Sequence, residues 1–120
     1  MKTKTAPKMS ESDLQCAAVS ALRLQYPDLL IFHVPNGRAR SPRTGAMLKR
    51  EGTLAGTPDL LILGPQGHVL ALELKVKGGS LSEAQKAWRD RATALGAPYH
   101  VCTTVESTLE HTRRWLDSLD

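Results

Sequence analysis

The chain has 120 residues, which is enough for one domain with a modest core but not for two domains of ordinary size. Apolar residues make up 41% and charged residues 23% of the sequence, so the composition is that of a globular protein and excludes wholesale disorder. The net charge of +4 permits a polyanionic partner without proving one. No apolar stretch approaches the roughly 20 residues of a membrane helix, and the N-terminus lacks the apolar segment of a signal peptide. We therefore expect a cytoplasmic protein with no membrane partner.

A basic tail precedes the first helix of the predicted domain. Residues 1–9 lack apolar periodicity, so we expect a flexible tail followed by a single domain over residues 10–120. Ser10 is a favoured N-cap residue, and apolar side chains then recur at helical spacing. These features predict a first helix over Glu11–Tyr26, which Pro27 ends.

Three strands and one long loop are predicted in the middle of the chain. The apolar run Leu29–Val34 is rich in strand formers and is closed by a Pro-Asn-Gly turn. Residues 38–56 show no strong periodicity, which predicts a long loop with one helical turn near Met47–Arg50. Two further apolar runs, Asp59–Leu63 and His68–Val76, are joined by Gly-Pro-Gln-Gly, and this short link favours an antiparallel hairpin.

The C-terminal third predicts a helix, a strand and a final helix. Ser80 and Glu83 have the spacing of a capping box, and the helix that follows is expected to end before the next glycine. The fourth strand is expected over Tyr99–Thr103, and Thr103 with Glu106 can cap the last helix. The element order is therefore αβββαβα, a mixed α/β sandwich. The apolar positions expected to form the buried face of the first of these helices are Leu81, Ala84, Trp88, Ala92 and Leu95.

Three charged residues stand out because they interrupt apolar strands. Asp59 begins the second strand directly after Pro58, and Glu73 and Lys75 lie on the face of the third strand opposite its leucines. If that face is covered, buried carboxylates and ammonium groups need a partner or a metal ion. If the strand is at an edge with a wet face, Glu73 and Lys75 are simply solvated. Both alternatives are open at this point.

The length of the hairpin connection decides whether Asp59 and Glu73 can act together. A connection of three or five residues would place them directly opposite each other on one face, with Cβ atoms roughly 5 Å apart. Two such carboxylates repel, and a hard divalent cation with oxygen ligands, including the carbonyl of Leu74, would fit between them. Lys75 would then project from the same face toward the bound metal ion. A four-residue connection would shift the register by one residue and require a bulge, so the register stays open.

Three motifs follow one another in an order that resembles a known nuclease superfamily. Gly56-Thr57-Pro58-Asp59-Leu60, Glu73-Leu74-Lys75 and Ser82-Glu83-Ala84-Gln85 resemble the G-x-P-D, E-x-K and S-x-x-Q motifs of the PD-(D/E)xK nucleases. Within that superfamily the chain looks most like the small VRR-NUC (virus-type replication-repair nuclease) domains, which the turn Val34-Pro35-Asn36-Gly37 also fits. The resemblance covers about residues 10–104 and implies a restriction-endonuclease-like αβββαβα core, a mixed central sheet flanked by helices.

The resemblance also implies roles for individual residues. Asp59 and Glu73 match the metal ligands, and Lys75 matches the catalytic lysine. Glu11 matches the acidic residue that often completes the metal site, directly or through water, although the helix dipole explains a first-turn carboxylate equally well. Gln85 matches the glutamine that helps to orient the site, with a polar residue at the border of the buried face as the alternative. The implied cofactor is Mg²⁺ or Mn²⁺.

Basic residues gather in the predicted loop before the second strand. No acidic residue occurs between Phe32 and Arg50, and the segment includes Gly37 and Gly45. Such a run is usually a solvated loop, but here it can follow a phosphate backbone without reading base sequence. His33, beside the Pro-Asn-Gly turn, can contact DNA or form a local hydrogen bond. The DNA-binding residues that we expect are His33, Asn36, Arg38, Arg40, Arg43, Lys49 and Arg50.

These observations predict a metal-dependent, structure-selective DNA endonuclease that hydrolyses phosphodiester bonds. Small VRR-NUC proteins resemble Holliday-junction resolvases that act as dimers, so the resemblance implies a homodimer that acts on four-way junctions or related branched DNA in recombination and repair. It also suggests a phage protein in a bacterial host, or a bacterial cytoplasmic protein. The alternatives are a nicking or flap-type nuclease with another preferred substrate, a non-catalytic DNA-binding subunit, and a small interaction protein whose Glu73 and Lys75 are solvated.

Overall fold

The central sheet has mixed strand directions. In the computed structural model, which describes residues 9–35 and 41–119, four strands pair in the order β1 (Leu30–Phe32), β2 (Leu60–Leu63), β3 (Val69–Leu74) and β4 (Tyr99–Cys102). The first three are antiparallel neighbours, whereas β4 runs parallel to β3. Parallel neighbours need a crossover connection, and a helix supplies it here.

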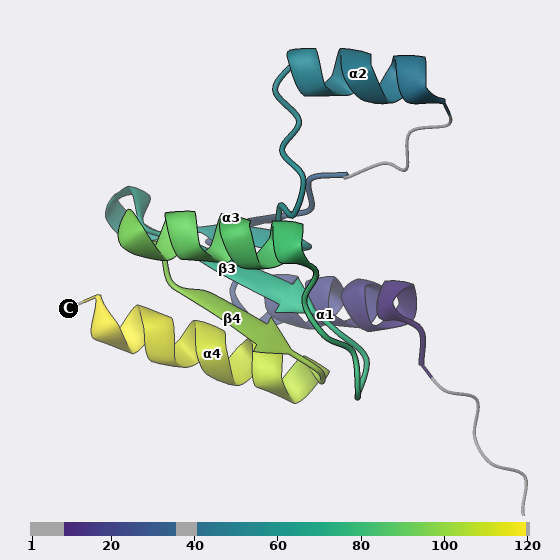
Figure 1. The fold of residues 1–120 in the computed structure, drawn as a ribbon. Helices are drawn as coiled ribbons and strands as arrows, with labels where there is room; N and C mark the ends of the chain where they lie inside the picture. Colours follow the sequence, from purple (N-terminus) through teal and green to yellow (C-terminus); the bar gives the residue numbers. More distant parts are fainter. Residues whose placement is uncertain (1–8, 36–40, 120) are drawn as a thin grey trace, which may run out of the picture.

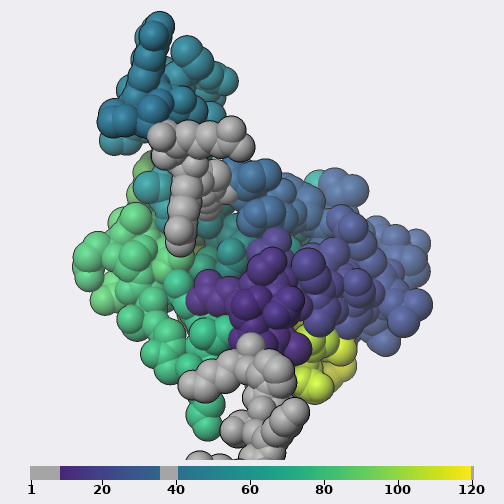
Figure 2. Space-filling view, turned by 90° about the vertical axis from the view of Figure 1, so that its right-hand side faces the viewer, coloured from purple at the N-terminus to yellow at the C-terminus, as the bar shows by residue number. Residues whose placement is uncertain are grey.

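Helices cover both faces of this sheet (Figure 1). The helices α1 (Glu11–Gln25) and α4 (Val105–Ser118) pack together on one face, and α3 (Glu83–Ala94) lies on the opposite face. In contrast, α2 (Pro42–Arg50) projects away from the rest of the molecule in both views (Figure 1, Figure 2). The expected mixed α/β architecture, a mixed sheet flanked by helices, is therefore confirmed.

The side chains of β2 and β3 alternate between the two faces of the sheet, and those on one face form the core with α1 and α4. Leu60, Leu70, Leu72 and Leu74 are fully buried, and successive strand residues point to opposite faces, so these side chains share one face. Burial of each leucine stabilises the fold by about 1.5–3 kcal/mol. The core thereby holds the two strands that carry the unusual charges in one register. The buried side chains that the two helices contribute to this core are Leu14, Ala18, Leu22 and Trp115.

The connection between β2 and β3 has the odd length that the paired-carboxylate hypothesis requires. β3 begins at Val69, one residue later than expected, so residues 64–68 form a five-residue connection. Leu63 pairs with Val69 at the hairpin end. The same register, continued toward the start of β2, sets Asp59 opposite Glu73.

The loop expected over residues 38–56 contains a complete helix, α2, rather than one helical turn. Its N-cap is Ser41, whose hydroxyl accepts a hydrogen bond from the Thr44 amide at 3.2 Å, and Pro42 occupies the first turn. None of the nine described residues of α2 is buried. The helix is short and packs none of its residues into the core, and the Ser-Pro pair is a local sequence signal for its start.

The helix α3 begins at Glu83, and the capping box predicted at Ser80 and Glu83 is wrong. Ser82, not Ser80, is the N-cap: its hydroxyl accepts from the Gln85 amide at 3.2 Å, and Gln85 Oε1 accepts from the Ser82 amide at 2.9 Å. Both serines have a suitable partner three residues later, and a contact of Gln85 with β3 favours Ser82. The expected buried face is also only partly present, because Leu95 is exposed and no described residue of α3 is fully buried.

The helix α4 begins one residue later than expected, because Thr104 and not Thr103 is its N-cap. The hydroxyl of Thr104 accepts a hydrogen bond from the Ser107 amide at 3.0 Å. Among the helices that the described residues form, none has the length and apolar character needed to cross a membrane.

Candidate active site

Asp59 and Glu73 face each other on the side of the sheet that α3 covers. Asp59 immediately precedes β2, and Glu73 lies near the end of β3 on the face opposite the core leucines. The Asp59 amide donates a hydrogen bond to Glu73 Oε2 at 3.2 Å, and the Leu74 amide donates to Asp59 Oδ2 at 2.8 Å. Two main-chain donors therefore orient the two carboxylates.

Lys75 and Gln85 both approach the Glu73 carboxylate. Lys75 Nζ lies 3.9 Å from Glu73 Oε1, and the Lys75 side chain is 13% exposed. Gln85 Nε2, from the first turn of α3, donates a hydrogen bond to the same oxygen at 2.9 Å. Because Gln85 also closes the capping box, the start of α3 and the orientation of Glu73 depend on one side chain. The structure thus brings four of the predicted site residues together.

Gly56 brings the segment before Asp59 close to α3. Its φ of +83° lies in the left-handed region, which side chains other than glycine disfavour. A Cβ at this position would overlap the main-chain carbonyl of Ala84 in α3. Only glycine allows this approach, which sets the Gly-Thr-Pro-Asp segment against the same helix turn that carries Gln85.

Glu73 has a strongly perturbed pKa. Burial raises the pKa of Glu73 from 4.5 to about 8, and the charge of Asp59 adds to this shift, whereas the charge of Lys75 opposes it. Glu73 is only 2% exposed, so water does little to relieve the repulsion between the carboxylates. The chain by itself therefore disfavours the ionised form of Glu73.

The donor set at this site fits a divalent cation. Two carboxylates face each other where burial makes a second negative charge costly, and a hard cation with oxygen ligands would offset that repulsion. Asp59 and Glu73 are the residues that could hold such an ion. The described residues contain no cluster of three or more His, Cys, Asp or Glu side chains suited to a metal ion, so Glu11 does not form one group with them.

Glu11 starts α1, which packs on the opposite face of the sheet. Its side chain is exposed in the first turn, where the helix dipole favours a carboxylate. Figure 1 shows the start of α1 at the same end of the molecule as the C-terminal end of β3. A role for Glu11 through water therefore stays a prediction, as does the Leu74 carbonyl as a third oxygen ligand.

Two further side chains lie next to the carboxylate pair. His33 forms the local hydrogen bond that was one of its two expected roles, with Nδ1 donating to the Asp59 carbonyl at 2.6 Å. Tyr99, which the sequence does not single out, pairs with Ala71 and so shares the face of Glu73. Its hydroxyl is buried with no hydrogen-bond partner within the described part of the chain. Burial, and then the charge of Glu73, raise the pKa of Tyr99.

Three of the predicted DNA-binding residues lie on the projecting helix. Arg43, Lys49 and Arg50 of α2 are exposed, and none of them forms an ion pair with another described residue. Such uncompensated cations suit contact with phosphates. Three other expected contacts lie outside the described residues, namely Asn36, Arg38 and Arg40.

The chain is similar to one protein family over most of its length. It matches the family model of the VRR-NUC domain over residues 9–106. A solved structure described as a VRR_NUC domain protein has a TM-score of 0.70 at 21% identity, with 92% of this chain and 91% of that chain covered. Another, described as a VRR_NUC domain, has a TM-score of 0.60 at 20% identity, with 86% and 94% covered. None of the curated proteins compared with the chain is a match. The chain therefore belongs to the VRR-NUC family and is a nuclease-type domain.

Proposed function

We propose that the chain is a DNA endonuclease that hydrolyses phosphodiester bonds with Mg²⁺ or Mn²⁺. The observation that carries this proposal is the facing pair Asp59 and Glu73, with Lys75 Nζ 3.9 Å from Glu73. A pure DNA-binding surface has no need of two carboxylates that face a polyanion. Asp59 and Glu73 would hold the cation, with the Leu74 carbonyl and, through water, Glu11 as further expected ligands. When bound, a divalent ion polarises the scissile phosphate and lowers the pKa of a bound water.

The chain's own side chains supply the rest of the chemistry. Lys75 is placed to neutralise charge that develops on the phosphate during in-line attack by water. Gln85 holds Glu73 and the Leu74 amide holds Asp59, so both carboxylates are oriented before substrate arrives. Glu73 must lose its proton to hold a cation, and with a pKa of about 8 the metal-free chain favours this loss only as the pH rises through about 8.

Branched DNA is the substrate class that we propose, with the Holliday junction as the leading example. The exposed cations of α2 support contact with phosphates, which positions DNA but reads no base sequence. The described residues of one chain carry one carboxylate pair, whereas symmetric cleavage of a junction needs two sites. A homodimer that presents two sites to one junction meets this need. A nicking or flap-type preference is the alternative within the same chemistry.

Cleavage assays on matched DNA structures test the proposal. Labelled four-way junction, flap, splayed-arm, duplex and single-stranded DNA are incubated with Mg²⁺, Mn²⁺ or EDTA. We expect metal-dependent cleavage that is fastest on the junction, and a loss of about 10²–10³-fold in rate for Asp59→Asn and Lys75→Gln. Lys77→Gln removes an exposed lysine two residues farther along and should keep most of the rate.

The outcomes separate the parts of the proposal. Cleavage in EDTA, or by Asp59→Asn at the unaltered rate, would contradict the metal-dependent mechanism. Salt-sensitive DNA binding without cleavage of any structure would support a non-catalytic DNA-binding subunit instead. Equal cleavage of duplex and junction would contradict the proposed preference for branched DNA, and the proposed nuclease activity would stand. A monomeric mass in solution, with and without junction DNA, would contradict the homodimer.

A further inference from the structure

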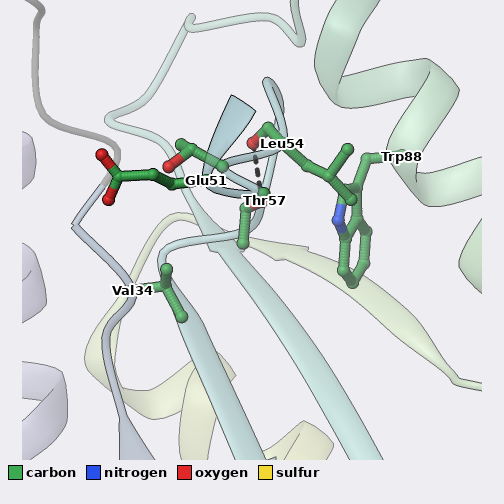
Figure 3. Close-up of a pocket in the computed structure, with 7 residues that line it drawn as sticks. Val34, Glu51, Leu54, Thr57 and Trp88 are labelled. Carbon is green, nitrogen blue, oxygen red and sulfur yellow. Dashed lines mark hydrogen bonds between the residues drawn. The ribbon is translucent and has the colours of Figure 1, made fainter. Parts of the chain in front are cut away.

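Two adjoining cavities lie beside Trp88, between α3 and the segment that follows α2. Their volumes are about 390 Å³ and about 370 Å³. Pockets for small ligands measure roughly 300–1,000 Å³. Figure 3 shows the first cavity, in which the Leu54 side chain extends toward the indole of Trp88. The residues that border both cavities are Gly52, Thr53, Leu54 and Trp88.

The cavities adjoin the candidate active site along two segments of the chain. Thr57 borders the first cavity and stands two residues before Asp59, a separation of at most about 7 Å between Cα atoms. Ala84 borders the second cavity and immediately precedes Gln85, which holds Glu73. A nucleotide whose phosphate lies at the two carboxylates can therefore extend its base toward these cavities.

The side chains around the cavities suit a flat aromatic group attached to a phosphate chain. Trp88 and Leu54 offer an aromatic and an aliphatic surface, and Leu54 is 53% exposed although it is large and apolar. The ring of Tyr99 lies 6.0 Å from that of Trp88, centroid to centroid, and supports the indole from within the fold. Lys49 and Arg91 border the second cavity, whereas Glu51 borders the first, so the positive charge lies beside the second cavity. Every nucleobase has an aromatic face that can stack on such a ring.

We propose that the Trp88 cavities bind an unpaired nucleobase of the DNA substrate, next to the bond that is cleaved. This proposal rests on the proposed nuclease function and deepens it: the recognised feature is an unpaired base, not a base sequence. Continuous duplex offers no such base, and a four-way junction offers one only where a base pair opens at its branch point, so the cavities favour flaps, splayed arms, bulges and opened junctions. Trp88 and Leu54 are then specificity-determining residues, distinct from the catalytic residues.

Removal of a single base tests this proposal without cleavage. A duplex with one unpaired nucleotide is compared, in EDTA, with the same duplex in which that nucleotide is abasic, and affinity is measured by fluorescence anisotropy. For the unaltered chain we expect loss of the base to weaken binding about tenfold or more, the size expected for one stacked base. Trp88→Leu should bind the two DNAs equally, whereas Trp88→Phe should keep part of the difference.

A second pair of variants guards against a folding defect in Trp88→Leu. Leu54→Ser changes an exposed side chain and should also reduce the preference for the base, whereas Leu95→Ser, at another exposed leucine, should not. Circular dichroism and thermal unfolding establish that each variant is folded, and Leu54→Ser decides the question if Trp88→Leu is not.

The base-site proposal and the proposed nuclease function are contradicted by different results. Equal affinity of the unaltered chain for the two DNAs, no binding to either, or an unchanged preference in Leu54→Ser would each overturn the base site. Cleavage is scored separately with Mg²⁺. Cleavage without a preference for the base would contradict only the proposed base site. A preference for the base without cleavage would contradict only the proposed nuclease function.

Discussion

Asp59 and Glu73 face each other across β2 and β3, with the Asp59 amide donating a hydrogen bond to Glu73 Oε2 at 3.2 Å. The register of the hairpin enforces this arrangement, because Leu63 pairs with Val69 and the residues before and after them follow in step. Core leucines on the other face hold the strands in that register. The fold therefore holds an electrostatically unfavourable pair in place, an arrangement that is common at functional sites.

Glu73 should make the metal-free chain less stable as pH rises from 4.5 to about 8. Its folded-state pKa lies above its ordinary value, so in this range the folded chain holds a proton that the unfolded chain has lost. By linkage, the free energy of unfolding falls with rising pH and levels off above the folded pKa. Glu73→Gln cannot ionise, and at about pH 9 it should be more stable than the unaltered chain by about 2 kcal/mol, even if only half of the shift contributes.

Chemical unfolding in EDTA across this pH range measures the difference between the two proteins. Asp28→Asn removes an exposed carboxylate and serves as the control, because its pH dependence should follow that of the unaltered chain. The same slope of unfolding free energy against pH in Glu73→Gln and in the unaltered chain would contradict the raised pKa of Glu73.

A divalent cation and a proton should compete for Glu73. Because a cation requires the ionised carboxylate, Mg²⁺ or Mn²⁺ should bind more tightly as pH rises toward 8. A ligand that binds only the folded chain raises its stability, so the thermal midpoint should increase with metal concentration, and more at about pH 8 than at about pH 6. Asp59→Asn should abolish this increase. A metal-induced increase in the thermal midpoint that does not depend on pH, or that persists in Asp59→Asn, would indicate that the ion binds at another site.

Local patterns predict most of the fold but not the register of the hairpin. Strand alternation and the N-cap Ser10 predict β3 and α1 to within two residues at each end. The register depends on whether His68 joins the strand or the connection. The His68 amide donates to the Pro65 carbonyl at 3.2 Å, and this turn bond adds His68 to the connection. The motif resemblance identifies Asp59 and Glu73 as candidate site residues. The pairing that places them opposite each other is seen only in the structure.

The features that the sequence does not predict are of two kinds. Two depend on contacts between residues that are distant in the sequence, and one is a helix that packs no residue into the core. Tyr99 reaches the face of Glu73 through the parallel pairing of β4 with β3. The choice of Ser82 as N-cap is coupled to the hydrogen bond between Gln85 and Glu73, twelve positions apart. The helix α2 buries no residue against the rest of the fold within its described part, so an argument from core-forming residues misses it.

Ser82→Ala and Gln85→Ala should separate capping of α3 from orientation of Glu73. Ser82→Ala removes the N-cap and should lower the free energy of unfolding by about 1 kcal/mol, while the bond from Gln85 to Glu73 remains. Gln85→Ala removes the reciprocal cap and also the donor at Glu73 Oε1, so its cleavage rate should fall as well. Unfolding and metal-saturated cleavage are measured on both variants. Equal cleavage rates would argue against an orienting role for Gln85.

Gly56→Ala should destabilise the chain more than Gly52→Ala does. Both positions have positive φ, +83° and +105°, so both substitutions strain the backbone. A Cβ at position 56 would also overlap the Ala84 carbonyl, whereas one at position 52 meets nothing within 4 Å. We expect losses of about 1 kcal/mol for Gly52→Ala and about 3 kcal/mol for Gly56→Ala. Unfolding by denaturant measures both, and losses of equal size would contradict the close approach of Gly56 to α3.

His100 of β4 and His111 of α4 should make the packing of α4 sensitive to acid. Their rings stack with centroids 4.0 Å apart and an interplanar angle of 15°. Burial, and then the neighbouring His111, lower the pKa of His100 below its ordinary 6.5. Below pH 6.5 the unfolded chain therefore takes up a proton that the folded chain resists, so the free energy of unfolding falls as pH drops.

Replacement of His111 tests whether the stacked pair causes this loss. His111→Phe keeps an aromatic ring against His100 but removes the second charge, so it should lose less stability than the unaltered chain between about pH 7 and about pH 5. His68→Gln removes an exposed histidine from the hairpin connection and should leave the acid sensitivity as it is. If His111→Phe loses as much stability in acid as the unaltered chain, repulsion within the pair is not the cause, and burial of His100 alone would explain the dependence.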